Sequence, residues 1–310
     1  DFVALQIVAT VFLTAELALA QVVIAEEFPA EARGMGQGLL GAAAAVGAGL
    51  AAALFPPLVN TRLGWRGLYF VGIVPLLIVG YLRRSLPETS QFAALDAEER
   101  RSGGVLRMLV PAYRRRFLVL MLIAAGAVAS FATAFSFASY RATTTFQWTP
   151  AQVSTMVLTG GGLGFWGWIL FGRVSDIVGR RPTAILCLLG AAAAISVFYR
   201  TQYLFPAFAA IVFFESGITI ALSALSTENF PTTLRATARA WVTNAGVVGA
   251  MLGLALVGAL SDRLAGHAAV VALLGLVPLG LAPLVLLVPE TLGRQLEAVV
   301  GQQTRAARAT

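Results

Sequence analysis

The chain has 310 residues, of which 58% are hydrophobic and only 12% are charged. An average soluble domain is about 45–50% apolar and about 25% charged, so the composition excludes a set of ordinary water-soluble domains. The mean hydropathy of +0.81 indicates a chain whose main solvent is lipid. The single cysteine, Cys187, excludes an internal disulfide framework, and the single histidine, His267, excludes the usual zinc-binding spacings.

Nine segments are apolar and long enough to cross a bilayer, which requires about 20 residues of helix. The third is the weakest candidate because it is short and contains Pro75. The sequence therefore predicts an all-α membrane protein with nine transmembrane helices. The spans are expected near Phe2–Ala25, Gly36–Pro56, Gly64–Leu82, Phe117–Tyr140, Val153–Phe171, Thr183–Tyr199, Leu204–Ser226, Trp241–Leu260 and Ala268–Val288.

The basic residues predict the orientation, because arginines in short loops favour the cytoplasmic side of a membrane. All 22 basic residues are arginines. If the first span ends inside, all but five of them lie in cytoplasmic segments, with Asp1 outside and Thr310 inside. The net charge of +7 is therefore attributed to topology, and no nucleic-acid partner is expected. The five external arginines are Arg62, Arg66, Arg141, Arg200 and Arg263.

An internal repeat emerges when the loops are compared. The pattern E-x-F-P-x-x-x-R occurs at Glu26–Arg33 and again at Glu228–Arg235, and Pro-Glu-Thr occurs at Pro87–Thr89 and again at Pro289–Thr291. Both pairs have the same offset, 202 residues, and each copy carries two spans between its two patterns. Duplicated helix bundles are typical of transporters in which a site between the halves faces either side of the membrane in turn.

The two copies differ in what precedes them. Three spans from Phe117 onward precede the second copy, whereas only the first span precedes the other. By the same offset we expect about 85 residues and three helices upstream of Asp1, which makes the nine spans part of a presumed twelve-helix, two-bundle fold. The expected divisions are residues 1–82, the last three helices of the N-terminal bundle; 83–116, a cytoplasmic linker; 117–288, a six-helix C-terminal bundle; and 289–310, a cytoplasmic tail.

The segment from Gly172 to Pro182, G-R-V-S-D-I-V-G-R-R-P, fills the predicted turn between the fifth and sixth spans. Asp176 can pair with an arginine or a helix N-terminus, Gly179 permits a sharp turn, and the arginines favour the cytoplasmic side. Arginines that only enforce topology are the alternative interpretation.

Together with the duplicated loops and the Pro-Glu-Thr ends, this segment resembles the major facilitator superfamily, and the resemblance covers the whole chain. In that family the charged residues of the loop motif latch the cytoplasmic ends of the two bundles in one conformation. The first-bundle copy of the motif would fall before residue 1. The resemblance implies a conformational latch that comprises Asp176, Gly179, Arg180 and Arg181, with Glu228 and Arg235.

The resemblance also implies a secondary active transporter that moves a small metabolite by alternating access. The Gln-Gln pair of sugar porters is missing from Phe117–Tyr140, and the Gly-Pro step of antiporters is missing from Gly34–Pro56. Both absences favour proton-coupled symport of an organic acid over a sugar porter or a drug/proton antiporter. The alternative from a different functional class is a non-transporting membrane sensor or a membrane-embedded enzyme. An enzyme is not expected, because the only histidine lies in a loop.

Two carboxylates, Glu16 and Glu215, lie well inside predicted spans, where an ionisable side chain costs about 2.5–3.5 kcal/mol and normally faces a cavity or a partner. Glu215 is the better candidate for a substrate or proton pathway, since Thr219 and Ser223 follow it at helical spacing. A structural hydrogen bond between helices is the alternative for both acids. Further pathway candidates are Ser130, Thr133, Tyr140, Arg141 and Asn244.

Some of these candidates have a competing interpretation. Small hydroxyls in membrane helices are as often packing contacts as substrate ligands, and Arg141 either binds a carboxylate or lies at the membrane interface. The expected partners are a small-molecule substrate, protons and the lipid bilayer, with no cofactor and no metal. We expect a multi-pass monomer in the plasma (cytoplasmic) membrane, which is the inner membrane of a bacterium.

Overall fold

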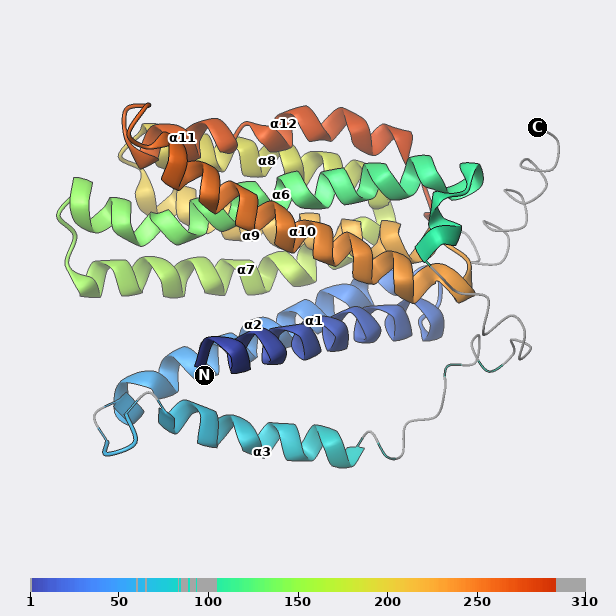
Figure 1. Cartoon of the computed structure of the whole chain (residues 1–310), viewed down its shortest axis with the longest axis horizontal. Helices are drawn as coiled ribbons and strands as arrows, with labels where there is room; N and C mark the ends of the chain where they lie inside the picture. The colour runs from blue at the N-terminus through green and yellow to red at the C-terminus, as the bar shows by residue number, and fades with distance from the viewer. Residues whose placement is uncertain are drawn as a thin grey trace.

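The computed structural model describes residues 2–59, 61–64, 66–82, 84, 89, 93 and 105–293, and within these ranges the regular structure is entirely helical. Long helices run back and forth beside one another and are joined by short turns (Figure 1). Pro87, Glu88, much of the predicted linker and the tail from residue 294 lie outside the described residues.

The helices fall into two groups. The N-terminal group contains α1 (Phe2–Glu27), α2 (Arg33–Val59) and α3 (Arg66–Leu82). The C-terminal group contains the short 3-10 helix η2 (Val105–Leu109), α6 (Pro111–Thr145), α7 (Pro150–Val178), α8 (Arg180–Arg200), α9 (Leu204–Glu228), α10 (Thr232–Leu260), α11 (His267–Leu274), α12 (Val277–Leu281) and the 3-10 helix η3 (Ala282–Leu287).

Each predicted span overlaps a helical segment, but several helices extend past the predicted apolar stretch. α6 begins at Pro111 rather than Phe117, and α10 begins at Thr232 rather than Trp241. Hydropathy marks only the part of a helix that lies in hydrocarbon, whereas the helix itself continues into the polar interface, where arginines are tolerated. The sequence pattern therefore underestimates helix length at the arginine-rich ends.

Seven helical segments of the described chain are long and apolar enough to cross a membrane. α1 is not among these seven, and α3 has only 17 residues. The expectation of nine spans is thus confirmed only in its coarser form, a multi-span helical membrane fold. α3 lies apart from the C-terminal group and packs against α2 (Figure 1), and its side chains Leu76 and Leu77 are 68% and 67% exposed.

The last predicted span, Ala268–Val288, is helical but interrupted. α11 ends at Leu274. The next residue is Gly275, whose N–H donates to the carbonyl oxygen of Val271, and Pro278 lies in the first turn of α12. Gly275 is needed for close packing, because a Cβ there would overlap the Ile195 side chain of α8. The chain then tightens into the 3-10 turns of η3, which bring its end back to the start of α8.

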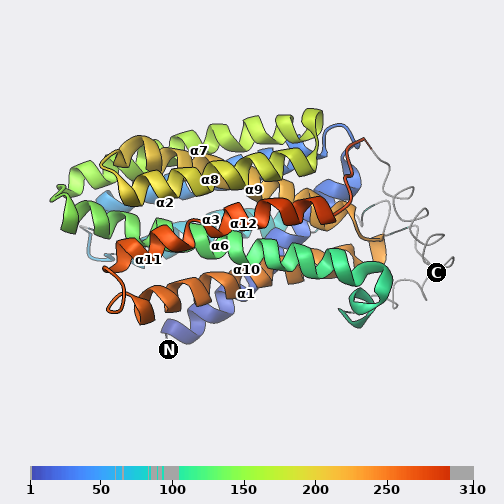
Figure 2. The ribbon, with the colours of Figure 1, turned by 90° about the horizontal axis from the view of Figure 1, so that it is seen from above.

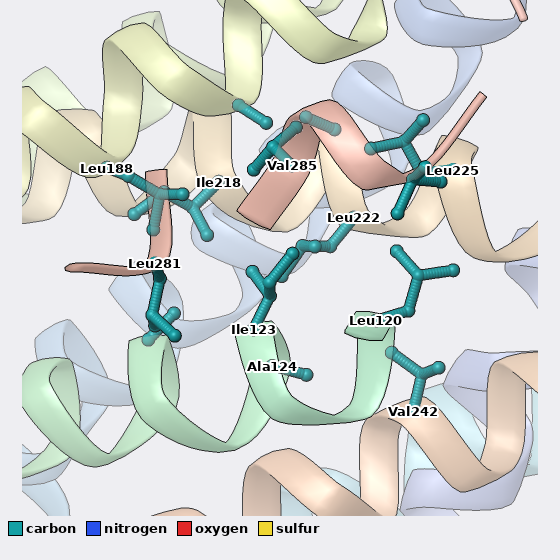
Figure 3. Packing of buried hydrophobic residues seen from close by; sticks show 14 of the residues in the cluster. Leu120, Ile123, Ala124, Leu188, Ile218, Leu222, Leu225, Val242, Leu281 and Val285 are labelled. Carbon is teal, nitrogen blue, oxygen red and sulfur yellow. The ribbon is translucent and has the colours of Figure 1, made fainter. Parts of the chain in front are cut away.

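Two apolar clusters hold the C-terminal group together. One includes Leu120, Ile123 and Leu222 (Figure 3), and the other surrounds Phe198 and Phe208. Lipid is as apolar as leucine, so these side chains stabilise the bundle by van der Waals packing rather than by leaving water. This packing fixes the positions of the polar residues at the C-terminal ends of α7 and α9 and at the N-terminal end of α8.

The two groups meet most closely where α2 runs along α7, while α1 runs beside α10 (Figure 2). A Cβ added to Gly38 would overlap the carbonyl oxygen of Trp168, and one added to Gly41 would overlap its indole ring. Further along α2, Gly47 and Gly49 have no such neighbour within 4 Å. The helices therefore touch near the start of α2 and diverge from there.

We call the end at which Glu26, Asp176 and Glu228 lie the motif end, and the other the opposite end. Where α2 and α7 diverge, an apolar cavity of about 420 Å³ separates them, lined by side chains that include Val46, Leu158 and Phe165. The two groups are thus joined by direct contact at the motif end and separated by a cavity beyond it.

Candidate functional site

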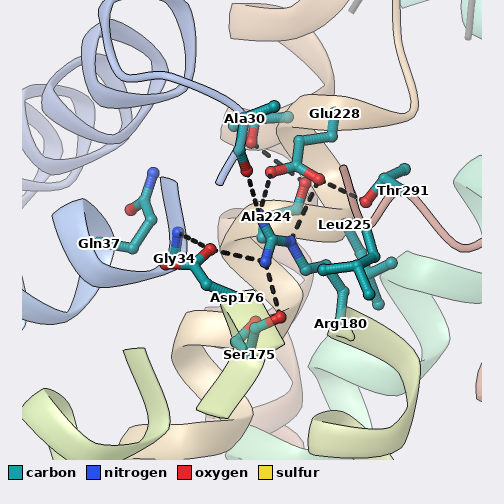
Figure 4. Close-up of polar contacts among 12 residues, drawn as sticks. Ala30, Gly34, Gln37, Ser175, Asp176, Arg180, Ala224, Leu225, Glu228 and Thr291 are labelled. Carbon is teal, nitrogen blue, oxygen red and sulfur yellow. Dashed lines mark hydrogen bonds and ion pairs between the residues drawn. The ribbon is translucent and has the colours of Figure 1, made fainter. Parts of the chain in front are cut away.

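Asp176, near the end of α7, joins the C-terminal group to the N-terminal group (Figure 4). Its Oδ1 accepts a hydrogen bond from the N–H of Gly34 at 2.8 Å, and its Oδ2 accepts one from the N–H of Met35 at 2.7 Å. Both donors belong to the first turn of α2, where N–H groups have no partner within the helix and carry a partial positive charge. The Asp176 carboxylate therefore caps a helix of the other group.

Arg180, the first residue of α8, is fully buried and bridges two acids. Its Nη1 donates to Asp176 Oδ1 at 2.7 Å and to the carbonyl oxygen of Ser175 at 2.6 Å. Its Nη2 lies 3.1 Å from Glu228 Oε1 and 3.4 Å from the carbonyl oxygen of Ala30, which belongs to the loop between α1 and α2. We call Asp176, Arg180 and Glu228 the Arg180 network; it ties α7, α8 and α9 to the N-terminal group.

The turn between α7 and α8 orients this network. Gly179 has a φ of 118°, a conformation that glycine adopts without steric cost. The Glu290 carboxylate accepts hydrogen bonds from the N–H groups of Arg180 and Arg181, at 3.0 and 2.8 Å, and so caps α8. The Arg181 side chain donates to the carbonyl oxygen of Leu286, within its own group. The predicted latch includes Arg181, but in the structure its side chain does not belong to the Arg180 network.

The 202-residue repeat reappears in the contacts of the duplicated motifs. Glu26 accepts a hydrogen bond from Thr89, and Glu228 accepts one from Thr291, so the two pairs are related by the offset of the sequence repeat. Arg235 Nη1 forms an ion pair with Glu26 Oε1 at 2.6 Å across the interface between the groups. Each group thus places a glutamate of its E-x-F-P loop in the shared interface.

The ion pairs just described form one polar layer at the motif end. A second polar layer, which we call the inner layer, lies four or five residues further into each helix, about 6–8 Å from the first along the helix axes. Arg239 Nε donates to Gln21 Oε1 at 2.6 Å, and Ser223 Oγ donates to Gln37 Oε1 at 3.0 Å. By the offset of 202, Gln21 corresponds to Ser223 and Gln37 to Arg239, so the two contacts are symmetry-related. No carboxylate of the described chain forms an ion pair with Arg239.

Hydropathy does not predict this inner layer, because Arg239 lies before the apolar stretch of its span and counts there only as a cytoplasmic loop arginine. The signal that reveals it is the alignment of the two copies, which places a polar residue in both copies at each of these positions. Gln37 also donates from Nε2 to the carbonyl oxygen of Gln21, at 2.7 Å, and so ties α2 to α1.

The predicted pathway on α9 is divided between two environments. Glu215 is half-buried, and Thr219 donates to its Oε1 at 3.4 Å. Ser223 is fully buried and belongs to the inner layer, about 12 Å further along the helix. Glu16 is half-buried on α1. The structure therefore brings Glu215 and Thr219 together and places Ser223 in the interface between the groups.

The hydroxyls on α6 bond to backbone carbonyls. Ser130 Oγ donates to the carbonyl oxygens of Gly126 and Leu274, at 3.0 and 2.7 Å, which links α6 to α11. Thr133 donates to the carbonyl oxygen of Ala129 at 2.9 Å and is fully buried. The sequence leaves open whether these hydroxyls pack against neighbouring helices or bind substrate. Their contacts with backbone carbonyls favour a role in packing.

The remaining candidates lie elsewhere. Asn244 is exposed on α10, whereas Tyr140 and Arg141 line a cavity at the opposite end, near His267. The predicted substrate and proton residues thus occupy several places in the fold, whereas Asp176, Arg180, Glu228 and Arg235 gather at one interface.

Substituting valine for Gly38 is expected to open this interface, because a side chain there overlaps the backbone of Trp168, which cannot move without shifting α7. Overpacking of this kind costs about 1–3 kcal/mol. The measurement is the rate at which a membrane-impermeant maleimide labels Ser223→Cys, which is buried in the inner layer; a several-fold increase is expected. Gly47→Val is the matched control, since in the described part of the chain no other helix lies within 4 Å of a Cβ at that position. Equal labelling in both variants would contradict the prediction.

A family model described as Major Facilitator Superfamily matches residues 2–170 and again residues 120–307. A Haemophilus influenzae protein named for metabolite transport is 26% identical over 316 residues, covering 96% of this chain and 75% of the relative. A Cupriavidus pinatubonensis protein named for 4-methylmuconolactone transport is 26% identical over 306 residues, covering 92% and 68%. The Bacillus subtilis protein NiaP, named for niacin/nicotinamide transport, is 27% identical over 280 residues, covering 84% and 66%.

Solved structures give the same fold. The proton:xylose symporter XylE, bound to 6-bromo-6-deoxy-D-glucose, aligns with a TM-score of 0.72 at 19% identity, covering 93% of this chain and 70% of that chain. FucP in its outward conformation aligns with a TM-score of 0.73 at 13% identity, covering 87% and 72%. These similar proteins are transporters, in agreement with the expectation that the chain is not an enzyme.

Proposed function

Because this chain belongs to the major facilitator superfamily, and is therefore a multi-pass membrane transporter, we propose that it takes up a small organic acid by alternating access, in symport with protons. The observation that supports this best is the contact of the two helix groups at the motif end, through the Arg180 network and the inner layer. The bonds from Gly34 and Met35 to Asp176, and the bonds of the inner layer, join one group to the other, so they can break while each group remains folded.

The proposed cycle begins from the conformation described above, in which the motif end is closed. The arginine distribution in the sequence assigns this end to the cytoplasm, so the conformation is proposed to face outward. Separation of α2 from α7 would break the bonds from Gly34 and Met35 to Asp176 and open the cytoplasmic side.

Glu215 is the proposed coupling group. A carboxylate in the middle of a membrane span normally faces a cavity or a partner, because an isolated charge there is costly. Glu215 is half-buried, and the group that donates a hydrogen bond to its carboxylate is the hydroxyl of Thr219 rather than an arginine. A carboxylate without a fixed cationic partner is free to bind and release a proton in successive conformations.

The proposal of an organic acid rests on Arg239. This guanidinium is buried between the groups, and within the described part of the chain its acceptor is the neutral amide of Gln21. Such a group favours an anion over a neutral sugar. The names of the relatives agree with a small metabolite, since one is named for niacin/nicotinamide and another for 4-methylmuconolactone. A sugar porter and a drug/proton antiporter remain the alternatives to be tested, and a monomer in the plasma membrane is the proposed working form.

The test is uptake into proteoliposomes that hold the purified full-length protein and an imposed pH gradient, alkaline inside. Labelled niacin and benzoate are expected to accumulate faster than in protein-free vesicles, where these weak acids enter only passively, and a protonophore is expected to abolish that accumulation, whereas labelled xylose should not accumulate. Accumulation of xylose alone would identify a sugar porter. Absence of all accumulation in correctly reconstituted vesicles would contradict transport and favour the sensor.

A further inference from the structure

A small cavity at the opposite end lies within the C-terminal group, where α6, α8 and the start of α11 come together. Its volume is about 230 Å³, and its lining includes Phe137, Tyr140, Arg141, Tyr199 and His267. Pockets for drug-sized ligands are usually about 300–1,000 Å³, so this cavity suits a smaller molecule. It is separate from the Arg180 network and from the cavity between α2 and α7.

Arg141 gives this cavity its charge. The guanidinium lies between two rings, 5.3 Å from the Phe146 centroid and 5.7 Å from the Tyr199 centroid. Its Nη2 donates to the carbonyl oxygen of Thr201 at a long 3.5 Å, and its Nε is buried with no hydrogen-bond partner. A long bond to a neutral carbonyl leaves the charge of this guanidinium uncompensated.

Among the described residues, those that line the cavity include no aspartate or glutamate. Arg141 therefore faces its space without a compensating carboxylate, and an anionic ligand would supply the missing negative charge. The planar guanidinium presents two parallel N–H groups in the geometry that matches the two oxygens of a carboxylate.

Rings form the wall beside this charge. The Tyr140 and His267 rings lie 4.9 Å apart between centroids, and those of Phe137 and His267 lie 5.4 Å apart. The Tyr199 hydroxyl donates to the carbonyl oxygen of Ala134 at 2.7 Å, which fixes that ring as part of the cavity wall. Such a wall binds a small flat apolar body by stacking.

We propose that this cavity is a binding site for a small organic carboxylate, whose oxygens bind Arg141 and whose body packs against Tyr140 and His267. The inference deepens the proposed function, on which it rests, because it adds a second carboxylate site at the end where the substrate would enter. The site collects the anion at the surface before it passes between the two helix groups.

The test uses a local readout, so that binding here is separated from binding elsewhere in the protein. Thr144 lines the cavity and is exposed, and the native Cys187 is fully buried. In nanodiscs without any gradient, benzoate is expected to slow maleimide labelling of Thr144→Cys at least tenfold. Benzamide, which has the same shape without the charge, is expected to give no protection.

Adding Arg141→Gln is expected to abolish the protection by benzoate, whereas Arg263→Gln is expected to preserve it, because Arg263 is exposed at the same end and does not line the cavity. A matching thermal midpoint for the two variants shows that both are folded. Equal protection by benzoate and benzamide, or unchanged protection in Arg141→Gln, would overturn the carboxylate site. Protection without gradient-driven uptake would instead overturn the proposed transport and leave this site standing.

Discussion

Replacing Arg180 with glutamine is expected to open the motif end and to destabilise the protein by about 3–5 kcal/mol, because removing one partner of a buried ion pair leaves an uncompensated charge. Arg180 lies between the carboxylates of Asp176 and Glu228, and both acids are buried with it. Without the guanidinium the two acids, which both belong to the C-terminal group, repel each other, and this repulsion disturbs the bonds of Asp176 to Gly34 and Met35 across the interface. Maleimide labelling of Ser223→Cys is expected to rise at least tenfold, and the thermal midpoint to fall.

Arg173 supplies the matched control, since it belongs to the same loop motif and is exposed. Arg173→Gln is expected to label like the parent protein. Asp176→Asn is expected to be intermediate, at about 1–3 kcal/mol, because an amide oxygen still accepts one hydrogen bond from the start of α2 but the charge is lost. If Arg180→Gln labels no faster than Arg173→Gln, Arg180 is not part of a latch.

The substitution Glu215→Gln is expected to abolish pH-driven accumulation of the organic acid while leaving expression and counterflow exchange intact. Glutamine keeps the size of the side chain and can still accept from Thr219, whose hydroxyl bonds to Glu215 at present, but it cannot bind a proton reversibly. The measurement compares gradient-driven uptake with exchange of labelled for unlabelled substrate in the same proteoliposomes. Accumulation is expected to fall by at least tenfold, with exchange within a factor of two.

Two other acids serve as controls for this prediction. Asp262 is exposed in the loop before α11, so Asp262→Asn is expected to transport normally. Glu16 is the mid-span acid of the N-terminal group, and Glu16→Gln shows whether any half-buried carboxylate has the same effect. Normal proton-driven uptake by Glu215→Gln would make Glu215 a structural residue. Equal loss in Glu16→Gln would show that coupling is shared between the groups.

The broad architecture of this protein could be predicted from its sequence. Apolar runs locate the helices because a backbone in lipid must satisfy its hydrogen bonds within each segment, and the run lengths follow from the thickness of the bilayer. The repeated offset between Glu26 and Glu228 predicts two related halves, and the structure places both glutamates in one interface, each with its own threonine. The loop motif likewise predicts that Asp176 and Arg180 belong to one charged cluster.

The tertiary structure decided which of these residues meet. Arg181 is next to Arg180 in the chain, yet it bonds within its own group, because successive residues at a helix start point in different directions. The contact of Arg239 with Gln21 joins residues 218 positions apart, and the cavity beside Arg141 depends on where α11 begins. Such contacts depend on the rotation and spacing of packed helices, which apolar periodicity leaves undetermined, because in lipid every face of a helix is apolar.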